Sequence, residues 1–241
     1  MQSSHSPESR VLSIVIPVYN EKELLTRVLR FVESAPLPDG ISRQIVLVDD
    51  GSTDGTRELL LELAQQREDL IVILQPENRG KGAALRSGFQ AATGDWIIVQ
   101  DADFEYDPND FSALLSPILR GDADVVYGSR FAIPDLHRGW HRRMNRFLTI
   151  LSNMTTGLKL TDMECCYKLF KRADIQSIPL KENRFGFEPE VTAKMARRKL
   201  RVVEVPVSYA GRSYDEGKKI GWKDGISALR CILKYGLTSR D

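Results

Sequence analysis

The stretch Trp96-Ile97-Ile98-Val99-Gln100-Asp101-Ala102-Asp103 joins an apolar run to two carboxylates. The run predicts a buried strand of an α/β protein, and side chains two positions apart in an extended chain point the same way. Asp101 and Asp103 at the carboxyl end of this strand can therefore face one hard cation. The stretch predicts a site for a divalent metal that carries phosphates.

The tripeptide Asp-Ala-Asp occurs a second time, at Asp122 to Asp124. This copy follows Arg120-Gly121, the predicted end of a helix, so we expect its side chains to lie in a solvated turn without a role in a site. The first copy differs because a strand precedes it and Glu105 and Asp107 follow it. The position in the fold, and not the tripeptide itself, carries the prediction.

Short apolar strands alternate with amphipathic helices from Val11 to about Tyr127. This alternation predicts an α/β fold whose mostly parallel sheet is sandwiched by helices. The predicted strands are Val11 to Pro17, Gln44 to Val48, Leu70 to Leu74, Trp96 to Gln100 and Val125 to Tyr127.

After Gly128 strands and helices alternate less regularly, and basic residues are mixed with apolar ones. The elements expected there are a helix through Asn153, a strand Tyr167 to Phe170, a helix from Pro189 to about Arg198, a strand Val202 to Val207 and a helix from about Gly221 to Tyr235. No interdomain linker is recognisable, so we expect one domain over residues 11–237. The polar residues 1–10 are expected to form a disordered lead-in.

Composition excludes several classes of protein. The 241 residues carry a formal net charge of +1, which disfavours a globally basic nucleic-acid binder. The first ten residues lack the apolar centre of a signal peptide, and no window reaches the roughly 18 apolar residues of a spanning helix. The three cysteines fit neither a disulfide framework nor a metal-ligand spacing, so we expect a cytoplasmic protein that is soluble or lies on a membrane surface.

Polar or turn residues follow four of the predicted strands at their carboxyl ends, where open parallel sheets bind ligands. The four segments are Pro17-Val18-Tyr19-Asn20-Glu21, Asp49-Asp50-Gly51-Ser52, Asp101-Ala102-Asp103 and Gly128-Ser129-Arg130. Any one of them is compatible with ordinary turn chemistry, but their coincidence on one edge predicts a binding site.

A glycine-rich loop, Asn78-Arg79-Gly80-Lys81-Gly82, lies between the predicted strands Leu70 to Leu74 and Trp96 to Gln100. It lacks the spacing of a Walker phosphate loop, and the dinucleotide fingerprint GxGxxG is absent after the first strand. The glycines still allow the backbone to approach a ligand, and Lys81 at a helix start can face a diphosphate.

Together these motifs resemble the inverting nucleotide-sugar glycosyltransferases of family 2, which have the GT-A fold. Within that family the chain is similar to the polyprenyl-phosphate group, which includes dolichol-phosphate mannosyl- and glucosyltransferases. The segments that carry the resemblance, beyond those quoted above, are Thr161-Asp162-Met163-Glu164-Cys165-Cys166-Tyr167-Lys168, Arg184-Phe185-Gly186-Phe187-Glu188-Pro189-Glu190 and Tyr209-Ala210-Gly211-Arg212.

The resemblance implies a role for each segment on the donor side. Asp49 would accept a hydrogen bond from the base, which suits uracil and guanine equally. Asp101 and Asp103, with Glu105, would hold Mg²⁺ or Mn²⁺ against the diphosphate. The residues that would contact the nucleotide sugar are Pro17, Tyr19, Asn20, Glu21, Asp49, Gly80, Lys81, Asp101, Ala102 and Asp103.

The acceptor side is implied in the same way. A phosphate monoester is largely a dianion at neutral pH and is already a nucleophile, so it needs orientation by arginines and no general base. Arg130, Arg143 and Arg212 match the acceptor-phosphate positions, although Arg142 and Arg146 compete for the middle place. The candidates for sugar contact are Asp162, Glu188 and Glu190, of which the last two could instead start a helix.

We therefore expect a metal-dependent inverting transferase that moves a hexose from GDP-mannose or UDP-glucose to a polyprenyl or dolichyl phosphate, giving a β-linked lipid-phosphate sugar. It would lie peripherally on the cytosolic face of a membrane, and the contact would come from residues 138–147, from residues 232–237 or from a membrane partner subunit. The basic-aromatic stretch Tyr214, Lys218, Lys219 and Trp222 would be an acceptor or headgroup loop, or else a solvated face. Two alternatives stay open: transfer to a saccharide hydroxyl, with Glu188 or Glu190 as general base, and a non-catalytic nucleotide-sugar-binding subunit.

Overall fold

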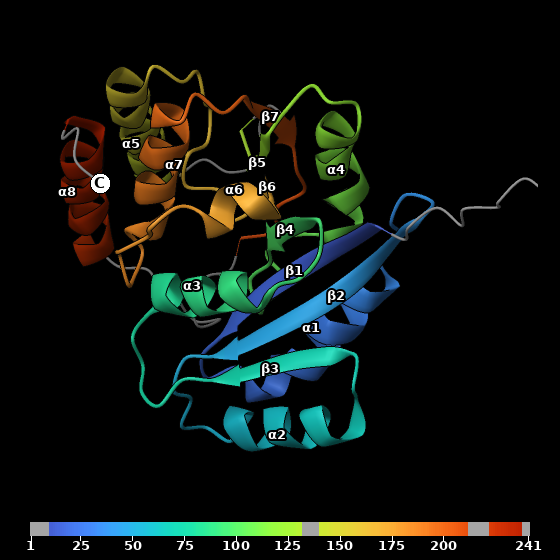
Figure 1. Cartoon of the computed structure of the whole chain (residues 1–241). Helices are drawn as coiled ribbons and strands as arrows, with labels where there is room; N and C mark the ends of the chain where they lie inside the picture. Colours follow the sequence, from blue (N-terminus) through green and yellow to red (C-terminus); the bar gives the residue numbers. More distant parts are fainter. Residues whose placement is uncertain (1–9, 132–139, 212–221, 238–241) are drawn as a thin grey trace, which may run out of the picture.

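A sheet of seven strands in the order β3-β2-β1-β4-β6-β5-β7 runs through the part of the chain that the structure describes (Figure 1). The computed structural model describes residues 10–131, 140–211 and 222–237. All neighbouring strands are parallel except where β6 pairs with β4 and β5. The strands are β1 (Arg10–Val18), β2 (Ile41–Asp49), β3 (Leu70–Leu74), β4 (Trp96–Val99), β5 (Val125–Ser129), β6 (Lys168–Lys171) and β7 (Val202–Pro206). The predicted single α/β domain is confirmed.

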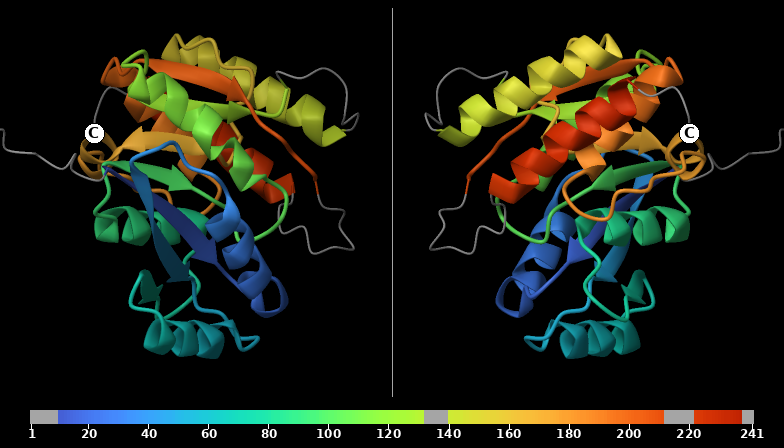
Figure 2. Two further views of the ribbon diagram at one scale, coloured as in Figure 1. Left: turned by 90° about the vertical axis from the view of Figure 1, so that its right-hand side faces the viewer. Right: turned by 90° about the vertical axis from the view of Figure 1, so that its left-hand side faces the viewer.

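Helices cover both faces of the sheet (Figures 1 and 2). α1 and α4 lie on one face, and α3 lies on the other face with the group α5, α7 and α8. The helices are α1 (Lys22–Ser34), α2 (Thr56–Gln66), α3 (Lys81–Ala91), the 3-10 turn η1 (Pro108–Asp110), α4 (Phe111–Leu119), α5 (Trp140–Thr156), α6 (Arg172–Gln176), α7 (Phe187–Arg197) and α8 (Trp222–Leu237).

The core follows the predicted patterns. The apolar stripe of α1, which includes Leu25 and Val32, is fully buried, and β4 is buried along its whole length. Of the predicted lead-in, only Arg10 lies within the described residues, and it opens β1. No helix among the described residues is long and apolar enough to cross a bilayer.

Strand β6 is the feature of the sheet that positions the site. It lies between β4 and β5 and runs antiparallel to both, with Ile98 beside Leu169 and Tyr127 beside Lys168. Because its direction is reversed, the segment 161–167 enters the sheet at the edge where β4 and β5 end. Residues from the second half of the chain therefore join those from the first half at one rim.

Candidate active site at the carboxyl edge of the sheet

Lys81 is the residue at which three elements of this rim meet. As the first residue of α3 it extends toward β4, and its Nζ lies 2.8 Å from Asp101 Oδ1 and 3.6 Å from Glu188 Oε1 of α7. Burial opposes its charge, but the neighbouring carboxylates of Asp101 and Glu188 hold the pKa of Lys81 well above its ordinary value. The ammonium is thus a fixed cation next to the predicted metal ligand.

Asp103 lies two residues after Asp101, in the turn that follows β4. Its side chain is largely buried, and Oδ1 accepts a hydrogen bond from the backbone N–H of Glu105 at 2.9 Å. The Glu105 carboxylate itself accepts from the hydroxyl of Tyr209 at 3.1 Å. Among the described residues no three metal-ligating side chains are assembled into one cluster, so the predicted trio with Glu105 is not formed.

The loop after β1 is tied to the loop after β2. Asn20 has φ +52°, a left-handed conformation that asparagine tolerates, and its Oδ1 accepts from Thr53 N at 2.8 Å while its own N–H donates to Ser52 Oγ. Asn20 therefore holds the two loops together. Pro17, Tyr19 and Glu21 are half-buried around it, at the edge where a nucleoside pocket is predicted.

The two aspartates at the end of β2 have different partners. Asp49 is fully buried and forms an ion pair of 2.6 Å with Arg57, and Ser52 N also donates to it. Asp50 accepts from the backbone N–H groups of Arg79 and Gly80, which fixes the glycine-rich loop, and burial raises its pKa. The sequence did not single out Asp50 for this role, because its partners lie 29 and 30 residues away.

The glycines of that loop are explained by a neighbouring backbone. Gly80 has φ +98°, and a Cβ there would lie 2.6 Å from the carbonyl oxygen of Asn183. A Cβ on Gly82 would lie 2.4 Å from the carbonyl oxygen of Glu182. The absence of side chains at Gly80 and Gly82 therefore allows the backbone of the segment 182–184 to pack closely against this loop.

Arg130 at the end of β5 is held by Asp162. Its Nε and one terminal nitrogen donate to the two carboxylate oxygens at 2.6 and 2.7 Å, and Asp162 is fully buried. Burial disfavours the charge, but nearby Tyr106 and Asp162 keep the pKa of Arg130 well above its ordinary value. Asp162, predicted as a sugar contact, instead fixes the guanidinium of Arg130.

A second arginine shares an aromatic ring with Arg130. The guanidinium carbons of Arg130 and Arg142 lie 5.4 and 5.2 Å from the ring centre of Phe131, a cation–π geometry. Arg143, the predicted middle arginine, is exposed one position further along α5. Arg212 and the stretch 214–221 lie outside the described residues, and Gly211 is the last described residue before them.

Glu190 of α7 has a structural role. Its two oxygens accept from the backbone N–H groups of Lys181 and Glu182 and from Lys194 Nζ, all between 2.8 and 2.9 Å. These donors occupy both oxygens of Glu190, which was predicted as a sugar contact or a general base. It anchors the segment 181–182 to α7.

Glu188, two residues before it in the same turn, is different, because its Oε2 atom is buried and has no hydrogen-bond partner among the described residues. Glu164 Oε1 is in the same situation. Burial and then the charge of Glu188 raise the pKa of Glu164 to about 8. Glu164 was not predicted as a site residue, although it stands inside the motif 161–168.

The second Asp-Ala-Asp, residues 122–124, lies away from the candidate site, but only one of its two aspartates has the solvent exposure that was expected. Asp122 is exposed and pairs with Arg120, whereas Asp124 is half-buried and pairs with Lys171 and Arg201. These partners hold the pKa of Asp124 well below its ordinary value. Asp124 thus fastens β5 to β6 and to the start of β7.

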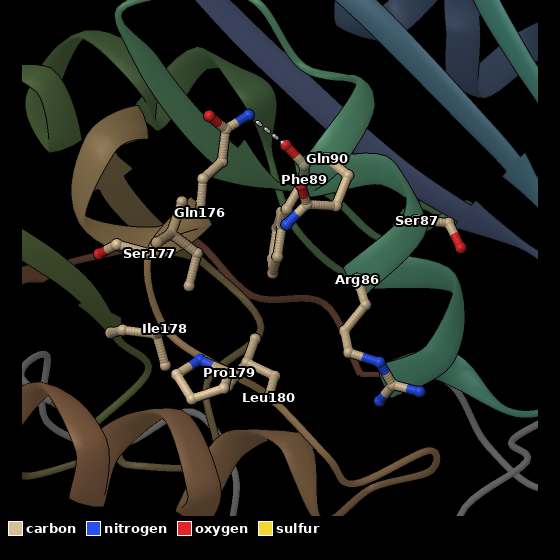
Figure 3. A pocket seen from close by; sticks show the side chains of 10 residues that line it. Arg86, Ser87, Phe89, Gln90, Gln176, Ser177, Ile178, Pro179 and Leu180 are labelled. Atoms are coloured by element: carbon tan, nitrogen blue, oxygen red, sulfur yellow. Dashed lines mark hydrogen bonds between the residues drawn. The ribbon is translucent and has the colours of Figure 1, made fainter. Parts of the chain in front are cut away.

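A cavity of about 450 Å³ lies elsewhere, between α3 and the segment 175–180 (Figure 3). No carboxylate is among the described residues that line it. Its lining Arg86 donates to Glu182 O and contacts Asn183, and Gln176 donates to Phe89 O. The cavity is therefore separate from the acidic rim.

Comparisons with known proteins agree with this architecture. An undecaprenyl-phosphate 4-deoxy-4-formamido-L-arabinose transferase of Edwardsiella ictaluri is 34% identical over 86% of this chain and 62% of its own length. The enzyme of the same name from Pseudomonas aeruginosa is 32% identical over 86% of this chain and 60% of its own. The chain thus spans about three fifths of the length of these curated relatives.

A solved structure has the same fold. Glucosyl-3-phosphoglycerate synthase from Mycobacterium tuberculosis, in complex with Mn²⁺, UDP and phosphoglyceric acid, superposes with a TM-score of 0.71 at 21% identity, covering 94% of this chain and 78% of that one. The fold is therefore GT-A. The model of the family described as glycosyl transferase family 2 matches residues 13–178. The chain belongs to glycosyl transferase family 2.

Proposed function

We propose that the chain is a metal-dependent inverting glycosyltransferase that moves a sugar, expected to be a hexose, from a nucleotide sugar to a polyprenyl phosphate. The observation that carries the proposal is the contact of Lys81 with Asp101 beside Asp103, at the carboxyl edge of a GT-A sheet. The names of the undecaprenyl-phosphate transferases to which the chain is similar support the lipid-phosphate acceptor.

The acidic pair fits a magnesium or manganese ion. Asp101 and Asp103 offer hard oxygen ligands, and a site with two carboxylates suits an ion whose remaining ligands are substrate phosphates and water. When bound, the ion would act as a Lewis acid that stabilises the departing nucleoside diphosphate. Lys81, at the start of α3, would supply a second positive charge on the same side.

The acceptor would enter from the β5 side of the rim. Asp162 orients Arg130, and Arg142 extends the positive surface across Phe131. A phosphate dianion placed by these arginines can attack the anomeric carbon without a base. The new bond forms between a phosphate oxygen and that carbon while the carbon–oxygen bond to the diphosphate breaks, its electron pair leaving on the nucleoside diphosphate.

Peripheral membrane attachment is part of this proposal. Apart from Leu61, the large apolar side chains exposed in the described part of the chain belong to α5 and α8. These two helices are neighbours (Figure 2). We call these side chains the α5–α8 face: Phe147, Ile150, Met154, Ile226, Leu233 and Leu237. The first half of α5 is basic, with Arg142, Arg143 and Arg146, which is typical of helices that lie on anionic lipid.

The test uses the purified chain with Mg²⁺ or Mn²⁺, a polyprenyl phosphate and, in turn, UDP-glucose, GDP-mannose and other nucleotide sugars. We expect a lipid-linked sugar phosphate with one donor, identified by mass spectrometry. Binding of donors without transfer to the lipid phosphate would overturn the acceptor assignment. Turnover by the chain alone would exclude a non-catalytic subunit.

A second candidate, transfer to a saccharide hydroxyl, is favoured by one observation, the unpaired Oε2 of Glu188. Such a transfer requires a general base within reach of the hydroxyl. Glu190 is engaged elsewhere, so Glu188 is the candidate for that base. Glu188→Gln would then abolish turnover while donor binding stays intact, and lipid phosphate would not serve as acceptor.

A further inference from the structure

Two carboxylates, Glu188 beside Lys81 and Glu164 in the segment that leads into β6, have buried oxygens without hydrogen-bond partners among the described residues. Glu188 is 4% exposed, and while its Oε1 lies 3.6 Å from Lys81, its Oε2 has no partner. Glu164 Oε1, in the segment that leads into β6, also has none. Native proteins pair nearly all buried polar atoms, so unpaired oxygens in a candidate site point to a polar ligand.

The neighbouring Glu190 shows what a purely structural carboxylate looks like in this helix. Both of its oxygens are occupied, by two backbone N–H groups and by Lys194. Glu188 stands two residues earlier in the same first turn and is buried to a similar extent. Charge compensation at the helix start explains neither the burial of Glu188 nor its unpaired oxygen, because such compensation works equally well from the surface.

The location of the pair fits the sugar and not the diphosphate. Lys81 contacts Asp101 on one side and Glu188 on the other. If Asp101 lies at the metal and the diphosphate, as proposed above, Glu188 lies one side chain further in, where the sugar attached to that diphosphate would reach. Glu164 belongs to the segment 161–167, which enters the sheet at the same edge, and its buried, unpaired Oε1 interacts electrostatically with Glu188.

We propose, on the basis of the proposed function, that Glu164 and Glu188 form a sugar-selecting pair that binds hydroxyl groups of a neutral donor sugar. Glu188, paired with Lys81, accepts a hydrogen bond from one hydroxyl. Glu164, which keeps its proton at neutral pH, can donate to one sugar oxygen and accept from another. A sugar that carries a carboxylate would meet Glu188 and Asp101 as like charges, so uronic acids are excluded.

Calorimetric titration of donors, with Mn²⁺ and without any acceptor, tests this pair. The titrants are UDP, GDP, UDP-glucose, GDP-mannose and UDP-glucuronic acid, and the variants are Glu164→Leu, which can neither donate nor accept, and Glu188→Gln. We expect each variant to bind the preferred neutral nucleotide sugar about 10-fold more weakly, the usual effect of losing one hydrogen bond to a charged or buried group. Affinity for the matching nucleoside diphosphate should change by less than about 2-fold.

The control is Asp124→Asn, which removes a half-buried, ion-paired carboxylate remote from the rim. It should lower the unfolding temperature and leave the ratio of nucleotide-sugar to nucleoside-diphosphate affinity unchanged. Equal weakening of both ligands in the glutamate variants, or a changed ratio in the control, would overturn the pair.

The possible failures are distinguishable. A wild-type chain that binds none of the five nucleotides would overturn the proposed function and this inference together. A chain that binds them, with unchanged sugar affinity in both variants, would overturn only the inference. Loss of turnover in Glu188→Gln with unchanged donor binding would likewise overturn it and assign Glu188 as a base.

Discussion

Lys81 and its carboxylates show how a few side chains determine the chemistry of this rim. One ammonium contacts the carboxylates of both Asp101 and Glu188, at 2.8 and 3.6 Å. Asp103 lies just outside this contact, with one oxygen fixed by the Glu105 N–H. A single cation therefore contacts both Asp101, a proposed metal ligand, and the buried carboxylate of Glu188.

Replacing Asp103 with asparagine tests the metal-facing pair. The amide oxygen of asparagine can still accept from Glu105 N, so the turn should persist while a charged metal ligand is lost. We expect turnover to fall by at least about 100-fold with an unchanged circular dichroism spectrum. Titration of activity with Mn²⁺ is the measurement, and normal activity in the variant would refute the metal assignment.

Glu164 predicts a pH dependence of stability. Its pKa rises from 4.5 to about 8 on folding, so between these values the folded chain holds a proton that the unfolded chain releases. The contribution of Glu164 to the free energy of unfolding is therefore fully present below about pH 4.5 and is lost as pH rises through about 8. Glu164→Gln does not titrate, so the stability of the variant relative to wild type should increase over this window.

Unfolding temperatures of both proteins between about pH 5 and 9 provide the measurement. The difference, variant minus wild type, should become more positive with rising pH. A constant difference would show that Glu164 is ionised in the folded protein at neutral pH. Glu204 differs from Glu164 in one respect. Burial raises the pKa of Glu204 as well, but three hydrogen bonds from residues 161 and 162 oppose that rise.

For individual residues, the sequence predicted which side chains have suitable chemistry better than it predicted which groups they contact. The positions of Asp101, Asp103 and Lys81 at this edge of the sheet could be predicted, because two of them follow a strand and the third starts a helix. Asp162 and Glu190 have the right chemistry for a sugar contact, but Arg130 and the N–H groups of residues 181 and 182 occupy them. Which partner takes an acceptor depends on segments brought together only in the fold, and no local pattern reports that.

At the scale of elements, the start of α3 depends on the loop packed against it. Gly80 combines φ +98° with the carbonyl of Asn183, which would lie 2.6 Å from an added Cβ. Gly121 has a similar φ of +77° but nothing within 4 Å of that position. Substitution of Gly121 therefore tests the cost of the positive φ alone, whereas substitution of Gly80 tests the positive φ together with steric crowding.

We expect Gly121→Ala to cost about 1 kcal/mol, the ordinary penalty of a left-handed alanine. Gly80→Ala should cost more, about 2 to 4 kcal/mol, because the backbone of segment 182–184 must also move. Chemical denaturation of both variants gives the comparison. Equal costs would show that this segment yields readily, and the packing would then not explain the glycine.

The α5–α8 face leads to a prediction about lipid binding. An aspartate at Met154 or Ile226, which are 76% and 59% exposed, should reduce binding to anionic vesicles several-fold with little effect on folding. Leu61→Asp is the matched control, since Leu61 is an exposed leucine on α2. Co-sedimentation is the assay, and an equal loss in the control would remove the α5–α8 face from the proposal.

The sheet itself was predicted for its first half and only partly for its second. β1 to β5 follow from alternation of strands and helices, and β6 was expected as a strand at residues 167–170. Its place between β4 and β5, antiparallel to both, did not follow from the pattern. Hydrophobic periodicity identifies an extended segment, whereas its neighbours depend on long-range pairing.

At the scale of the whole molecule, the β4–β6 junction divides the rim into two sides. The loops after β1, β2 and β4 and the start of α3 supply the proposed donor side. The β5 end and the first turn of α5 supply the proposed acceptor side, with Arg130, Phe131 and Arg142 in one stack. If this division is functional, substitutions on the acceptor side should leave donor binding intact.

Arg142→Ala and Arg143→Ala test that division and decide between two neighbouring arginines. Arg142 shares the Phe131 ring with Arg130, whereas Arg143 is exposed, so the geometry favours Arg142 as the acceptor-phosphate contact. We expect Arg142→Ala to raise the KM for polyprenyl phosphate by about 10-fold or more, the cost of a lost charge-assisted contact, with donor affinity unchanged. Arg143→Ala should change that KM less.

Arg120→Ala is the control, because this exposed arginine pairs only with its neighbour Asp122 among the ion pairs described. Initial rates at varied lipid phosphate and saturating donor, together with calorimetric donor binding, separate the two sides. A larger effect of Arg143 than of Arg142 would move the acceptor to the outer surface of α5. A loss of donor affinity in Arg142→Ala would mean that the rim is one site without separate halves, since a charge on the acceptor side would then also hold the nucleotide sugar.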